Sequence, residues 1–68
     1  MINSVEVTEQ VRTIFDTLDE TGTSITEFSR LTTISRATLQ HWKRGGYIND
    51  RLRLKIAVRE AGKLPSKS

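Results

Sequence analysis

The sequence lacks several features that stabilise or locate other small proteins. It contains no cysteine, so disulfides and thiolate metal sites are excluded, and it has one proline and four glycines among 68 residues. No stretch approaches the roughly 18 consecutive apolar residues of a membrane span. The N-terminus lacks the basic-then-apolar order of a signal peptide. These absences predict one small cytoplasmic domain.

The sequence also lacks the residue groupings that enzymes and metalloproteins use. His41 is the single histidine, and no acidic cluster adjoins it, whereas a zinc site needs three or four ligands. There is no nucleophile–base pair and no glycine-rich phosphate loop. We therefore expect no enzymatic activity and no metal, cofactor or small-molecule ligand.

Charge is divided unevenly along the chain. Residues 1–34 carry a formal charge of −4, and residues 35–68 carry +7. This division suggests an anionic partner for the second half, although a solvated basic surface without a partner is the alternative. A chain of this length buries only about 60% of its unfolded surface. Dimerisation is therefore an expected further source of stability.

Apolar spacing and capping residues predict four helices and no strand. The first covers about residues 6–20, capped by Ser4 or Thr8 and ended by Gly22. The fourth begins after Asn49 as its cap and stops at Gly62. One of its faces consists of Leu54, Ala57, Val58 and Ala61. We expect a compact all-α domain over residues 1–62 and a basic, flexible tail over residues 63–68.

Two short helices are expected between these long ones. The sequence of residues 24–27 is a capping box, in which the Ser24 hydroxyl accepts from the Glu27 N–H and the Glu27 side chain bonds back to the Ser24 N–H. A helix over about residues 25–31 follows. The β-branched Thr32 and Thr33 interrupt it. Ser35 caps the next helix, over residues 36–44, which ends at two glycines.

This arrangement predicts a helix-turn-helix over residues 24–44. Ile34 would fill the turn, and Ser29 is the small residue where the helices approach. The expected apolar anchors of the two helices are Phe28, Leu31, Leu39 and Trp42.

Residues 28–46 resemble the helix-turn-helix of the bacteriophage Cro and repressor family, in particular short Cro-like and YdaS-like prophage regulators. Residues 42–48, followed by a helix, also resemble the CII-type phage activators. The resemblance implies a lambda-repressor-like fold whose second helix enters the major groove of DNA. It also implies a strained or altered turn, because the family usually has glycine where this chain has Thr33.

The outward side of the second helix would then read bases. The Arg36 guanidinium matches guanine O6 and N7, Gln40 can pair with adenine, and Ala37 can meet a thymine methyl. The expected base contacts are Arg36, Ala37, Gln40, His41 and Arg44. Helix N-termini and flanking polar residues would hold phosphates. The expected phosphate contacts are Ser24, Thr26, Ser35, Thr38, Lys43, Tyr47, Asn49, Arg51 and Lys55.

The sequence thus predicts a sequence-specific regulator of transcription that binds double-stranded DNA. A Cro-type repressor of a phage or mobile element is the expected form, bound as a homodimer to a palindromic operator. Half-sites would lie about 10 base pairs apart. The expected dimer interface contains Ile48, Leu52 and Ile56. Two alternatives remain: an excisionase-like architectural protein, and an antitoxin or anti-repressor that binds another protein through the fourth helix.

Overall fold

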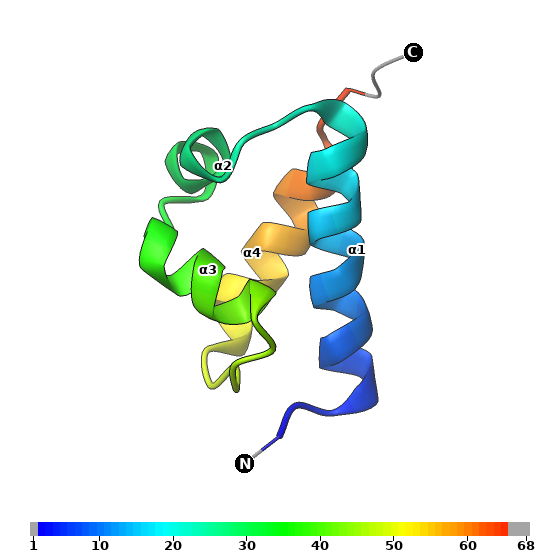
Figure 1. The fold of residues 1–68 in the computed structure, drawn as a ribbon, viewed down its shortest axis with the longest axis vertical. Helices are drawn as coiled ribbons and strands as arrows, with labels where there is room; N and C mark the ends of the chain where they lie inside the picture. The colour runs from blue at the N-terminus through cyan, green and yellow to red at the C-terminus, as the bar shows by residue number, and fades with distance from the viewer. Residues whose placement is uncertain (1, 66–68) are drawn as a thin grey trace.

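Four helices make up the domain in the computed structural model, which describes residues 2–65 (Figure 1). They are α1 (Val5–Thr21), α2 (Ile25–Thr32), α3 (Arg36–Lys43) and α4 (Arg51–Gly62). No strand occurs in the described range. None of the helices within it combines the length and apolar character that a bilayer crossing requires. The all-α, four-helix expectation is confirmed.

Side-chain caps fix where the helices begin. Ser4, Ser24 and Ser35 are the N-caps of α1, α2 and α3, and each hydroxyl accepts a hydrogen bond from a backbone N–H three residues later, at 3.1–3.2 Å. Each bond satisfies one of the N–H groups that a helix start leaves without a partner. Among the described residues, the expected return bond from the Glu27 side chain to Ser24 is absent.

Two boundary expectations were wrong. Asp50, not Asn49, caps α4, because its carboxylate accepts from the Arg53 N–H at 3.1 Å. α4 does end at Gly62, as expected, with Lys63 as its C-cap. Leu64 packs against the core, so the tail does not begin at residue 63. Residues 66–68 of the expected tail lie outside the described range.

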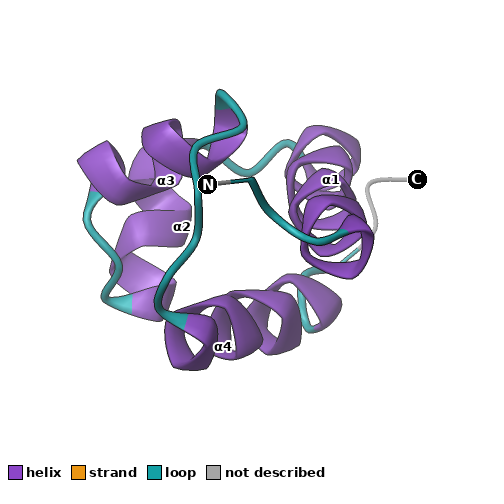
Figure 2. Cartoon of the chain, turned by 90° about the horizontal axis from the view of Figure 1, so that it is seen from below, coloured by secondary structure: helices purple, strands orange, loops and turns teal. Residues whose placement is uncertain are grey.

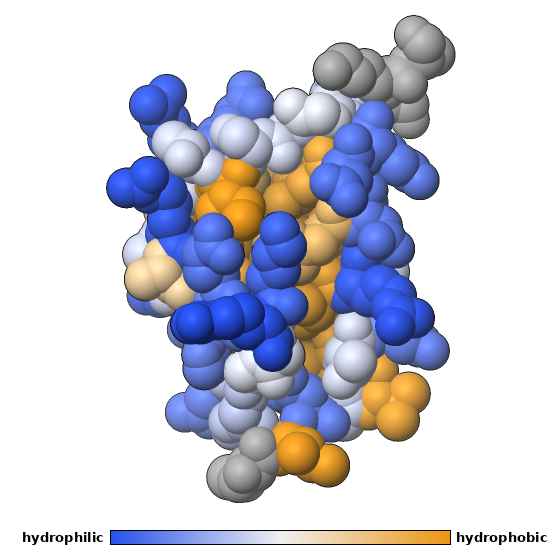
Figure 3. All heavy atoms as spheres, viewed as in Figure 1, coloured by the Kyte–Doolittle hydropathy of each residue, from blue (hydrophilic) through white to orange (hydrophobic). Residues whose placement is uncertain are grey.

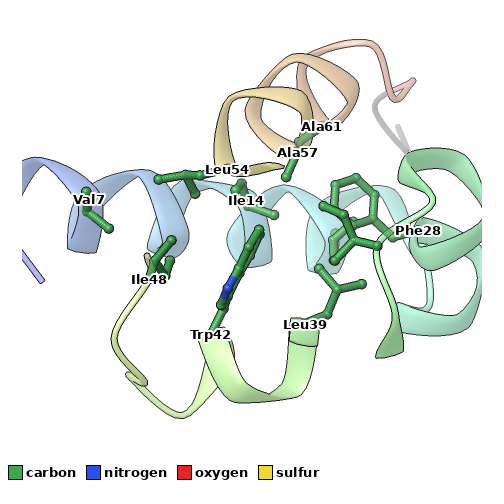
Figure 4. Close-up of a cluster of buried hydrophobic side chains, with 11 residues drawn as sticks. Val7, Ile14, Phe28, Leu39, Trp42, Ile48, Leu54, Ala57 and Ala61 are labelled. Atoms are coloured by element: carbon green, nitrogen blue, oxygen red, sulfur yellow. The ribbon is translucent and has the colours of Figure 1, made fainter. Parts of the chain in front are cut away.

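The core gathers side chains from all four helices. α4 packs mainly against α1, and α2 packs against α3; seen from below, α4 lies along one side of the domain and α1 lies opposite the α2–α3 pair (Figure 2). Figure 4 shows Trp42 and Leu39 pointing from α3 toward the other helices. The buried apolar residues are Val7, Ile14, Leu18, Phe28, Ile34, Leu39, Trp42, Ile48, Leu54, Ala57 and Ala61.

Most of the expected core residues lie inside, with two corrections. Leu31 does not anchor α2 from beneath, because it is 49% exposed. Val58 lies at the margin of the buried face of α4, at 36% exposure, while Leu54, Ala57 and Ala61 from that face are buried. Phe28, fully buried, is therefore the main apolar anchor of α2.

Candidate functional site

The exposed side of α3 is the candidate site. Leu39 and Trp42 are buried at 0% and 3% exposure and hold the other side of α3 on the core. Because an α-helix repeats every 3.6 residues, the positions between these anchors share one outward face. That face, which we call the α3 face, contains the exposed residues Arg36, Ala37, Gln40, His41 and Arg44, and Lys43 is exposed at its edge.

The turn before α3 is held by side-chain hydrogen bonds. The Thr32 hydroxyl donates to the Phe28 carbonyl at 2.8 Å and accepts from the Ile34 N–H at 3.3 Å. The Ser29 hydroxyl donates to the Ile34 carbonyl. Ile34 itself is buried and fills the turn, as expected. These bonds link the last turn of α2 to the chain that leads into α3.

Thr33 adopts the left-handed conformation, with φ 59° and ψ 19°. It is the one non-glycine residue with positive φ in the described chain. A β-branched residue in this region is unusual, because its Cβ crowds the backbone. The turn therefore keeps the left-handed geometry that glycine would favour, and Thr33 carries the strain.

His41 lies against the loop that follows α3. Its Nε2 is 3.2 Å from the Tyr47 carbonyl oxygen, and its ring occupies the space that a side chain at Gly46 would need. The Gly46 N–H in turn donates to the His41 carbonyl at 2.9 Å. His41 therefore supports the loop, in contrast to the freely exposed Arg36, Ala37 and Gln40 that share its helix face.

Asn3 holds the same loop from the opposite end of the sequence. Its Nδ2 donates to the Gly46 carbonyl at 2.9 Å, and its Oδ1 accepts from the Ile48 N–H at 2.7 Å. The N-terminal segment and the α3–α4 loop lie beside each other in Figure 2. Sequence reasoning missed Asn3, because its partners are 43 and 45 positions away and no local pattern signals such a contact.

The expected phosphate contacts do not form one group. Ser24 and Thr26 are exposed at the start of α2, and Tyr47 and Asn49 are exposed in the α3–α4 loop. The Ser35 hydroxyl is occupied as a cap and also bonds the Thr38 hydroxyl at 2.8 Å. Since that bond uses the O–H of only one of the two residues, the other hydroxyl can still donate to a phosphate.

The basic residues expected to contact phosphates lie on different sides of the domain. Lys43, at the end of α3, borders a groove of about 560 Å³ between α1 and α3. Lys55 lines another groove, between α1 and α4, whose lining includes Glu6 and Arg51 but no residue of α2 or α3. Lys55 therefore lies away from the α3 face, and we expect it to make no phosphate contact, whereas Arg51 also lines a second groove beside Tyr47.

The groove beside Lys43 has a mixed lining. Val11, Phe15 and Trp42 form its apolar part, and Arg12 and Asp16 are also at its wall. In Figure 3 hydrophobic atoms fill the furrow between α1 and the α2–α3 pair, and hydrophilic side chains border it. Residues 2–65 contain no cluster of acidic or histidine side chains suited to a metal ion.

The expected dimer residues differ in their accessibility. Ile48 is buried in the core of the single chain, at 4% exposure, so its side chain cannot contact a partner, and that expectation was wrong. Leu52 is 69% exposed on α4, and Ile56 is half-buried beside it in the α1–α4 groove.

Comparison with protein-family models, curated proteins and solved structures gives no match for this chain.

Proposed function

We propose that this chain is a sequence-specific regulator of transcription that binds the major groove of double-stranded DNA through α3. In this proposal α2, the turn and α3 act as a helix-turn-helix. The observation that carries the proposal is the exposure of Arg36, Ala37 and Gln40 together on a short helix whose opposite side is buried. Side chains at the start of such a helix can reach base edges while the core fixes the helix.

The chemistry of these three residues suits base recognition. A guanidinium can donate two hydrogen bonds to guanine, and a primary amide can donate to and accept from adenine. Arg36 and Gln40 are one helical turn apart, which fits contacts to neighbouring base pairs. No ion pair occupies Arg36 or Arg44 within the described chain. Their donors are therefore free for a nucleic acid.

Phosphate contacts would come from the elements that flank α3. The N-terminus of α2 has exposed polar residues, and helix N-termini attract phosphates through their free N–H groups. Lys43 and Tyr47 lie at the other end of α3. Contacts on both sides of the recognition helix would fix its depth and register in the groove.

The proposed regulator is a Cro-type repressor of a phage or mobile element that binds a palindromic operator as a homodimer. Exposed Leu52 and neighbouring Ile56 favour a second copy as a partner, because burial of large aliphatic side chains is favourable. The same surface favours a second candidate function, that of an antitoxin or anti-repressor. The excisionase-like alternative loses support, because residues 2–65 contain no hairpin that could serve as a wing.

Selection of bound sequences from random duplex DNA tests the proposal. The purified full-length chain should enrich a palindromic consensus whose half-sites lie about 10 base pairs apart. Arg36→Ala combined with Gln40→Ala serves as the matched control and should enrich no consensus. Failure of the parent chain to enrich any sequence would contradict the proposal and favour the protein-binding alternative.

A further inference from the structure

Asn3 orients both peptide groups that flank Tyr47. Its amide donates to the carbonyl that precedes Tyr47 and accepts from the N–H that follows Tyr47. In a trans peptide the carbonyl and the N–H point in opposite directions. Because the Gly46 carbonyl points toward Asn3, the Tyr47 N–H must point away from Asn3. Because the Ile48 N–H points toward Asn3, the Tyr47 carbonyl must also point away.

The contact of His41 agrees with this orientation. The Tyr47 carbonyl, directed away from Asn3, lies 3.2 Å from His41 Nε2 on the α3 face. Tyr47 therefore adjoins the end of the α3 face, with its peptide groups held by Asn3 on one side and His41 on the other. The Tyr47 N–H has no hydrogen bond within the described chain, and Tyr47, 39% exposed as a residue, borders a groove that Asn3 and Arg51 also line.

An N–H that is held in place, has no partner and belongs to a partly exposed tyrosine near Arg51 is suited to a phosphate oxygen. Backbone N–H groups and tyrosine hydroxyls are both common phosphate donors in protein–DNA contacts. The loop itself has two glycines, and a free loop of this composition would have to be ordered when DNA binds. Two hydrogen bonds from Asn3 supply that order in advance.

We propose that Asn3 is a positioning residue of the DNA interface, which directs the Tyr47 N–H and phenol toward a backbone phosphate of the bound duplex. The inference rests on the proposed function. It assigns Asn3 no contact with DNA. It adds the N-terminal segment, 43 or more residues away in sequence, to the elements that define the interface.

The test measures binding of the selected duplex to full-length Asn3→Ala. We expect a loss of affinity between about three- and tenfold, because one or two hydrogen bonds that hold the loop are removed. Binding to a scrambled duplex should weaken by a similar factor, since phosphate contacts carry no sequence information.

Nuclear magnetic resonance tests the Tyr47 N–H directly. In the parent, the Tyr47 amide resonance should shift downfield and its hydrogen exchange should slow when duplex is added. In Asn3→Ala both changes should be smaller.

Thr21→Val is the matched control for lost stability. The Thr21 hydroxyl makes hydrogen bonds to the Thr17 carbonyl and the Thr23 hydroxyl, both at 2.8 Å, at the far end of α1. The substitution is isosteric and removes these bonds while leaving the loop unchanged. If Thr21→Val weakened DNA binding as much as Asn3→Ala, global stability would explain the loss and the positioning role would be overturned.

A double-mutant cycle with Tyr47→Phe keeps the inference testable if Asn3→Ala does not fold. Asn3→Asp is isosteric and can still accept from the Ile48 N–H, but its carboxylate cannot donate to the Gly46 carbonyl. The affinity lost on Tyr47→Phe should be smaller in Asn3→Asp than in the parent, because a tyrosine that the loop no longer positions contributes less to binding. Comparing the two losses cancels the direct effect of the new charge on binding. Equal losses in both backgrounds would overturn the inference.

The outcomes also separate this inference from the proposed function. If the parent binds its selected duplex and Asn3→Ala binds it equally well, Asn3 has no positioning role and the function stands. If the parent binds no duplex, the function fails and the inference fails with it. In that case faster exchange of the Ile48 amide in free Asn3→Ala would still confirm the loop contact alone.

Discussion

α3 and α4 are both basic helices, but their charges have different neighbours. In α4, Arg53 lies 3.2 Å from its cap Asp50, and Glu60 has Lys63 at 3.3 Å and Arg59 at 3.7 Å. The cations of the α3 face, by contrast, have no carboxylate within ion-pair distance in the described chain. The two carboxylates of the second half are therefore both paired with cations of the α4 segment, and the cations of α3 have no such partner.

This difference separates charge that supports the fold from charge that is free for a partner. Exposed ion pairs of the α4 kind contribute only about 0–1 kcal/mol each to stability. With these carboxylates counted, residues 50–63 still carry a net charge of +3, the same as Arg36, Lys43 and Arg44 together. The difference lies in the pairing of individual side chains, because the α3 cations make no ion pair and keep their donors for an anionic partner. Net charge alone could not distinguish the two helices.

The largest expected effect concerns the buried side of α3, which holds that helix on the core. Leu39→Ala should lower the free energy of unfolding by about 2–5 kcal/mol, because a fully buried leucine is replaced and a cavity remains. Val5→Ala at the start of α1, at 77% exposure, is the control and should change stability by less than about 0.5 kcal/mol. Urea unfolding followed by circular dichroism measures both. Similar losses for the two variants would show that α3 is not anchored as described.

The second prediction compares one arginine from each helix. Arg36→Ala should weaken binding to the selected duplex by about 1–3 kcal/mol and relax the preference at one base position, because a bidentate base contact is lost. Arg53→Ala, which removes a cation already paired on α4, should change affinity by less than about twofold. Fluorescence anisotropy with matched and single-mismatch duplexes gives the numbers. If the two arginines behaved alike, the distinction between α3 and α4 would fail.

Local signals explain what could be predicted from the sequence. Serine caps, left-handed Gly22 and the spacing of buried residues fixed the number of helices and the buried side of α3, because each depends on neighbours within about one turn. The prediction that Asn49 caps α4 was wrong. Asparagine and aspartate both suit an N-cap, and only the backbone conformation shows that the cap is Asp50. Such one-residue errors leave the arrangement of the helices unchanged.

Contacts between distant segments could not be predicted. Ile48 was expected on a dimer surface, but its N–H donates to Asn3 and its side chain is buried in the core of the same chain. Lys55 was expected near α3, but the turn of α4 directs it toward α1. The exposed residues of the α3 face, which are the candidate base contacts, could be identified from helical periodicity alone. The residues that support them were not, because their partners are far away in sequence.

The strained turn offers a third prediction, on the element that sets the angle of α3. Thr33→Gly should raise the free energy of unfolding by up to about 1 kcal/mol, because glycine adopts positive φ without the Cβ clash, although its flexibility when unfolded offsets part of the gain. Thermal unfolding measures the change. DNA affinity should stay within about twofold of the parent, since the turn geometry is already left-handed. A destabilised Thr33→Gly would show that the turn is not strained.

The smallest expected effect compares two lysines that the sequence could not separate. Lys43→Ala should weaken binding to matched and scrambled duplexes alike and reduce the slope of log affinity against log salt by about 0.9, the value for one lost phosphate contact. Lys55→Ala should leave both quantities unchanged, because Lys55 lies in the α1–α4 groove that α3 does not reach. Titrations at several salt concentrations separate the two. A sequence-dependent loss for Lys43→Ala with an unchanged slope would mean that Lys43 contacts bases, whereas a reduced slope for Lys55→Ala would extend the interface to α4.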